Sequence, residues 1–133
     1  MKIMRWILAA ILAVFFVFMG IQKFGPDENI VFSILAENSG ISLFEPQIRL
    51  VTGIAEIFAG ILLIIPKMRV KGALLGLAIL IGALGFHLSP WLGINVPGIG
   101  NGLFMAALGA LVLNLAVLGL EKADQKITAL DKL

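Results

Sequence analysis

The sequence contains no cysteine and only one histidine among its 133 residues. The absence of cysteine excludes disulfide exchange, thiolate nucleophiles, iron–sulfur ligation and thiolate metal sites. One histidine cannot ligate a haem from both sides, and a histidine with a glutamate is a small donor set for a metal ion. We therefore expect no metal centre and no covalently bound cofactor, so that any redox role needs the electrons of a bound partner.

Charged residues are scarce as well. They make up 14% of the chain, against about 25% in a typical soluble domain. In contrast, 60% of the residues are hydrophobic and the mean hydropathy is +1.08. This composition predicts an integral membrane protein whose surroundings are lipid, with no nucleic-acid partner. The length accommodates four spans of about 20 residues with short connections, so we expect one domain, residues 1–133.

Four apolar stretches predict the spans, at about residues 5–24, 46–66, 70–89 and 101–120. The first stretch also resembles a signal peptide. Its uncharged run is longer than a signal-peptide core, and no small-residue cleavage site follows, which favours a retained anchor. Pro46 suits the first turn of a helix, whereas Pro66 and Pro90 end helices. The predicted fold class is all-α, an integral membrane four-helix bundle.

The only long polar connection is formed by residues 26–45. Within it the apolar residues Ile30, Val31 and Ile34 recur at helical spacing, while Glu28 and Glu37 take the other side. This pattern predicts a short amphipathic helix on the membrane surface, in the first external loop. An irregular loop is the alternative.

The positive charges predict the orientation of the bundle. Eight of the ten Lys and Arg residues lie at the N-terminus, in the central turn or in the C-terminal tail, namely Lys2, Arg5, Lys67, Arg69, Lys71, Lys122, Lys126 and Lys132. Because an even number of spans places both ends on one side, and because positive loops face the cytoplasm, both termini are predicted to be cytoplasmic. We expect a multi-pass protein of the inner (plasma) membrane.

Glu56 is the residue that is hardest to place in a bilayer. It follows Pro46 by ten residues, which corresponds to a depth of about 15 Å in a hydrocarbon core about 30 Å thick. A charge at that depth costs roughly 2.5–3.5 kcal/mol or more and usually marks a functional site. Arg49 and Thr52 precede it on the same helix face. The alternative is a carboxyl group that locks the bundle through hydrogen bonds.

Further polar residues fall at the same end of the other spans. Together they predict an outward-facing polar cup with Glu56 at its floor, formed by Lys23, Arg49, Thr52, Glu56, His87 and Asn101. Glu56 and His87 can exchange protons with a bound quinone, and the cationic side chains can hold a carbonyl or an anionic head group. We expect a noncovalently bound quinone or lipid and assign no catalytic residue.

Simpler interpretations of the same residues remain open. Lys23 can snorkel to the interface, Arg49 can do the same or pair with Glu45, and His87 can be an interfacial histidine without a ligand. Asn114, which lies toward the other half of the bilayer, is explained by an interhelical hydrogen bond.

Three segments of the chain resemble one known family. The first span ends in FMGIQKF, the second contains RLVTGIAEIFAGILLIIP and the third contains LLGLAILIGALGFHL. These segments are similar to the DoxX and DoxX-like family of small four-helix membrane proteins. The best match is Gly53 with Glu56, followed by Gly60, and the Gly20 to Lys23 segment matches the end of the family's first helix. The resemblance implies a four-helix fold and a link to thiosulfate:quinone oxidoreductase, to oxidative-stress complexes or, in distant animal relatives, to receptor-assembly chaperones.

These observations support three functional hypotheses. The leading one is a protein that binds a quinone or similar amphiphile in the cup and supports a redox or respiratory assembly. The alternative is a non-enzymatic assembly or chaperone subunit, whose partner is a membrane protein or a second copy of the chain. A small transporter is the weakest hypothesis, because the sequence has neither an inverted repeat nor a broken span.

Overall fold

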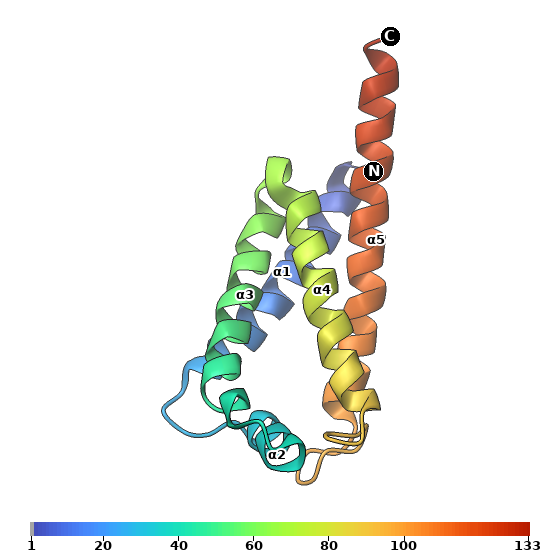
Figure 1. Cartoon of the computed structure of the whole chain (residues 1–133). Helices are drawn as coiled ribbons and strands as arrows, with labels where there is room; N and C mark the ends of the chain where they lie inside the picture. Colours follow the sequence, from blue (N-terminus) through green and yellow to red (C-terminus); the bar gives the residue numbers. More distant parts are fainter. Residues whose placement is uncertain (1) are drawn as a thin grey trace.

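The computed structural model describes residues 2–133, which form four long helices that alternate in direction along the chain (Figure 1). They are α1 (Lys2–Ile21), α3 (Gln47–Ile64), α4 (Arg69–Leu88) and α5 (Gly102–Asp131). Each is long and apolar enough to cross a membrane. The all-α prediction is confirmed, and the lengths and composition of these helices indicate a helical membrane protein.

The helices form a closed ring in the order α1, α3, α4, α5, with α1 also packed against α5. The main core fills the centre of this ring and is built from residues of all four helices, among them Leu12, Phe16, Leu63, Leu80 and Val117. Large apolar side chains such as Val14, Val51 and Val112 are exposed on the outside. An apolar exterior around an apolar core is the distribution expected of helices that face lipid.

Helices α1 and α3 approach closely because glycines lie between them. A Cβ atom on Gly20 would lie 2.8 Å from the Gly53 carbonyl oxygen, and one on Gly60 would lie 2.6 Å from the Val17 side chain. Real Cβ atoms are not found at such distances. The glycines therefore allow backbone contact between helices, as is common where lipid provides no hydrophobic drive for association.

Helices α3 and α4 form a hairpin around Pro66. The chain leaves α3 at Ile64, passes through the 3-10 turn η3 (Pro66–Met68) and enters α4 at Arg69. On α4, Gly76 faces Phe16 of α1 and Asn114 of α5. Asn114 Nδ2 donates a hydrogen bond of 2.9 Å to the Ala73 carbonyl oxygen, so the predicted interhelical role of Asn114 is confirmed.

Helix α5 continues well past residue 120, where the fourth span was predicted to end. It reaches Asp131, and its C-terminal part projects beyond the other helices in Figure 1. The residues of this extension include good helix formers such as Glu, Lys, Gln and Ala. Hydropathy predicts only the apolar part of a helix, so the extension was not predicted.

The end of the bundle opposite the two termini holds a short helix, α2 (Ile30–Ser39) (Figure 1). Asn29 caps its first turn by accepting a hydrogen bond from the Val31 N–H, and Gly40 ends it in the left-handed conformation with φ of 74°. Phe32 and Leu35 are buried against Phe44 and the loop that follows α4. We refer to this end as the α2 end and to the other as the terminal end. The location of α2 on a membrane surface remains a prediction.

Candidate functional site

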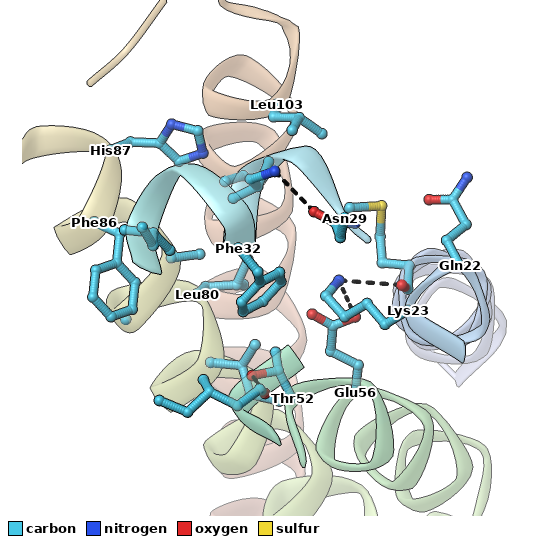
Figure 2. A pocket seen from close by; sticks show the side chains of 18 of the residues that line it. Gln22, Lys23, Asn29, Phe32, Thr52, Glu56, Leu80, Phe86, His87 and Leu103 are labelled. Carbon is cyan, nitrogen blue, oxygen red and sulfur yellow. Dashed lines mark hydrogen bonds and ion pairs between the residues drawn. The ribbon is translucent and has the colours of Figure 1, made fainter. Parts of the chain in front are cut away.

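A cavity of about 590 Å³ lies at the α2 end of the bundle. Helices α1 to α5 all contribute to its wall, which is mainly apolar. Figure 2 shows Phe32, Leu80, Phe86 and Leu103 among the lining residues. A volume of this size is typical of sites for small organic molecules. The polar and charged residues that line it are Gln22, Lys23, Asn29, Thr52, Glu56 and His87.

Lys23 and Glu56 form a buried ion pair at the cavity wall. Lys23 Nζ lies 3.0 Å from Glu56 Oε2, and the two residues are 8% and 6% exposed. Lys23 lies in η1 (Gln22–Phe24), the 3-10 turn that continues α1, and also donates to the Met19 carbonyl oxygen. A Cβ atom on Gly53 would lie 3.0 Å from that of Lys23. The absence of a side chain at Gly53 thus lets Lys23 pass α3 and reach Glu56 one turn further along.

The second oxygen of Glu56 is free for a ligand. Oε2 accepts from Lys23, whereas Oε1 receives no hydrogen bond from residues 2–133. In this part of the chain only Arg69 Nη2 and Asn114 Oδ1 are both fully enclosed and without a partner. Oε1 has no such partner and is not one of these two atoms, so it is not fully enclosed, and it belongs to a side chain that lines the cavity (Figure 2).

His87 has one nitrogen engaged and one open. Nδ1 lies 3.0 Å from the Gly93 carbonyl oxygen, and because a carbonyl only accepts, Nδ1 carries the proton. The ring packs edge-on against Phe104. Nε2 has no hydrogen-bond partner in the described part of the chain and is not enclosed. In the neutral ring Nε2 is therefore an acceptor that is available to the cavity.

Thr52 lines the cavity with its hydroxyl group already committed. Its Oγ1 donates a hydrogen bond of 2.7 Å to the Ile48 carbonyl oxygen, one turn earlier in α3. The hydroxyl hydrogen is thereby used, so Thr52 offers a ligand only the lone pairs of its oxygen.

Arg49 does not line the cavity, contrary to the predicted cup. Its Nε donates a hydrogen bond of 2.7 Å to Glu45, and its Nη1 donates to the carbonyl oxygens of Lys23 and Gly25. The alternative Arg49–Glu45 ion pair is thus confirmed. Glu45 also accepts from the Asn29 N–H at the start of α2. Arg49 holds the turns around the cavity in place and leaves its interior to other side chains.

Asn101 also lies outside the cavity. It is exposed, directly precedes α5 and makes no capping hydrogen bond with its side chain. The structure therefore brings together four of the six predicted residues and omits Arg49 and Asn101. Depth groups residues of different helices, and a shared face groups residues of one helix, but neither specifies which partner a long or exposed side chain reaches.

A second polar cluster at the terminal end was not predicted. Glu121 accepts from Arg5 at 2.9 Å and from Arg69 at 3.0 Å, and Arg69 Nε donates to the Leu63 carbonyl oxygen. Arg69 is 1% exposed and its guanidinium lies 4.3 Å from the ring centre of Trp6. From the sequence, Arg5 and Arg69 indicate only the orientation of the bundle. One feature of the sequence could have predicted this cluster. Glu121 follows the fourth apolar stretch, and Arg5 and Arg69 lie at the same end of the first and third spans.

No protein-family model, no curated protein and no solved structure matches this chain.

Proposed function

We propose that the protein binds a quinone or a similar amphiphile in the cavity at the α2 end and supports a redox or respiratory assembly of the inner membrane. The observation that carries the proposal is the combination of a mainly apolar cavity of about 590 Å³ with the Lys23–Glu56 pair and the open nitrogen of His87. An apolar wall with a few converging polar groups is the usual composition of a small-molecule site.

The arrangement suits an amphiphile better than a polar metabolite. Most of the wall consists of aliphatic and aromatic side chains, which would contact a ring or an alkyl tail. The polar groups are few and can orient the head group of such a ligand. The redox part of the proposal comes from the resemblance of the Gly53 and Glu56 segment to the DoxX-like family, and the inner membrane comes from the placement of the positive charges.

Binding to purified protein tests the proposal. The full-length protein in lipid nanodiscs is titrated with a short-chain benzoquinone and with its hydroquinone, and we expect saturable binding of at least one oxidation state. An Ala83→Phe variant, which fills part of the cavity, should weaken that binding at least tenfold. Ala116→Phe is the matched control, since Ala116 is exposed on α5 and away from the cavity. Failure of both oxidation states to bind would refute the proposed function.

An assembly subunit is the second candidate. The observation in its favour is the projecting part of α5, on which Ile127 and Leu130 are 56% and 59% exposed. A truncation after Lys122 should abolish cross-links to a protein partner in native membranes while leaving ligand binding intact. Identical cross-links in the truncated and full-length proteins would exclude this part of α5 as the contact.

A further inference from the structure

We infer that the cavity selects ligands that donate hydrogen bonds from hydroxyl groups, such as hydroquinones, over ligands that offer carbonyl oxygens or an anionic head group. This inference rests on the proposed function, because it specifies the chemistry of the amphiphile that the cavity takes.

The cations near the cavity are already neutralised. Lys23 is paired with Glu56, and Arg49 is paired with Glu45 outside the cavity. The wall therefore carries one ammonium and one carboxylate, with a net charge of zero when His87 is neutral. An anionic head group would meet no uncompensated positive charge and would be repelled by the Glu56 carboxylate.

The open polar atoms of Glu56 and His87 are acceptors. When Glu56 is ionised and His87 is neutral, the free Glu56 oxygen and the Nε2 atom of His87 can each receive a hydrogen bond and cannot donate one. The remaining N–H bond of Lys23 is a donor, since Nζ already donates to Glu56 and to Met19. A ligand hydroxyl group can accept a hydrogen bond from Lys23 and at the same time donate one to the Glu56 carboxylate. Beside Glu56, a carbonyl oxygen satisfies Lys23 alone and leaves the carboxylate oxygen facing an acceptor. The other amide donors of the wall, on Gln22 and Asn29, belong to residues that are exposed or half-buried.

The two acceptors stand apart along the bundle. Glu56 lies nine residues into α3 from Gln47, and His87 lies one residue from Leu88, at the same end of the antiparallel α4. At about 1.5 Å per residue their backbones differ in height by about 12 Å. Figure 2 shows His87 at the upper left and Glu56 lower and to the right, with Phe32 drawn between them. A ligand that reaches both acceptors therefore carries a hydroxyl group at each end of an apolar body.

Three matched ligands test the inference on the full-length protein in nanodiscs. They are a short-chain para-hydroquinone, its dimethyl ether, which has no donors, and the corresponding benzoquinone, all measured without oxygen. The hydroquinone should bind about tenfold more tightly than either of the others, the ratio expected for one hydrogen bond to a charged group. Equal or tighter binding of the benzoquinone or the ether would overturn the inference and leave the proposed function standing. Absence of binding by all three would instead remove the proposed function itself.

A Glu56→Gln variant tests the assigned acceptor directly. Its amide oxygen can remain toward Lys23, which places the NH₂ group, a donor, toward the cavity. The preference for hydroquinone should then be lost or reversed, whereas Asn101→Ala, at an exposed position outside the cavity, should keep it. If Glu56→Gln does not fold, His87→Ala removes the other acceptor and should reduce the preference. An unchanged preference in a folded variant of either residue would overturn the inference.

Discussion

At the scale of single residues, the buried ion pair of Lys23 and Glu56 is the main electrostatic feature of the cavity. Each charge alone would be strongly unfavourable in an apolar environment, and their mutual attraction compensates for part of the lost hydration. The pair is better understood as a means of keeping polar atoms beside the cavity than as a source of stability. Removing one partner therefore leaves the other charge buried without compensation, whereas removing both does not.

Lys23→Met should lower the free energy of unfolding by about 3–5 kcal/mol, because it leaves the Glu56 carboxylate buried without its partner. The double variant Lys23→Met with Glu56→Leu should recover most of that loss, since both charges are then absent. Thermal unfolding of the purified proteins in detergent measures both effects. A double variant that is less stable than the single one would show that the Glu56 carboxyl group has another stabilising partner.

The cluster at the terminal end gives a second comparison between residues. Glu121 is 3% exposed and serves two arginines, whereas the side chain of Asp124, which pairs with Arg5, is 42% exposed. Glu121→Leu should therefore destabilise the protein by about 3–5 kcal/mol, because it leaves the buried Arg69 without its carboxylate. Asp124→Leu should cost no more than about 1 kcal/mol, as is usual for exposed pairs. Equal thermal stabilities of the two variants would contradict the burial of the cluster.

At the scale of elements, the contact between α1 and α3 depends on glycines rather than on large side chains. Gly20→Ala would place a Cβ atom 2.8 Å from the Gly53 carbonyl oxygen, which forces the helices apart and should cost about 1–3 kcal/mol. Gly109→Ala in α5 is the matched control, since the described residues leave open space within 4 Å of that position. It should stabilise the protein by about 0.5–1 kcal/mol through helix propensity. Thermal unfolding measures the change in stability of each variant. Changes of the same sign in both variants would exclude close backbone packing at Gly20.

At the scale of the whole molecule, the orientation in the membrane is open to a direct measurement. The chain has no cysteine, so introduced single cysteines report on their own positions only. Asn95 is exposed in the loop between α4 and α5, at the α2 end, and Lys126 is exposed on the projecting part of α5. In intact cells or right-side-out vesicles, a membrane-impermeant maleimide should label Asn95→Cys and leave Lys126→Cys unlabelled, because positive loops are retained in the cytoplasm. Permeabilisation should make both accessible. Labelling of Lys126→Cys alone before permeabilisation would reverse the predicted orientation.

The candidate site was predicted in part, and the successes and failures have different causes. Lys23, Thr52, Glu56 and His87 were predicted from polarity and depth and do line the cavity. Arg49 shares a helix face with Thr52 and lies one turn nearer the α2 end, but its longer side chain reaches Glu45 and the turns after α1. The ion pair between Lys23 and Glu56 was not predicted, because it depends on the distance between α1 and α3, and that distance depends on Gly53.

Hydropathy and helix-breaking residues are local properties of the chain, so they suffice to predict the all-α class, the four apolar helices and the costly carboxyl group in the second of them. The predicted orientation also comes from the sequence, through the positions of the positive charges. Which polar groups meet is visible only in the folded bundle. There Glu56 pairs with Lys23, Arg49 pairs with Glu45 outside the cavity, and Arg69 pairs with Glu121. These contacts depend on helix rotation and on glycine-mediated approach, which arise from the packing of all four helices together.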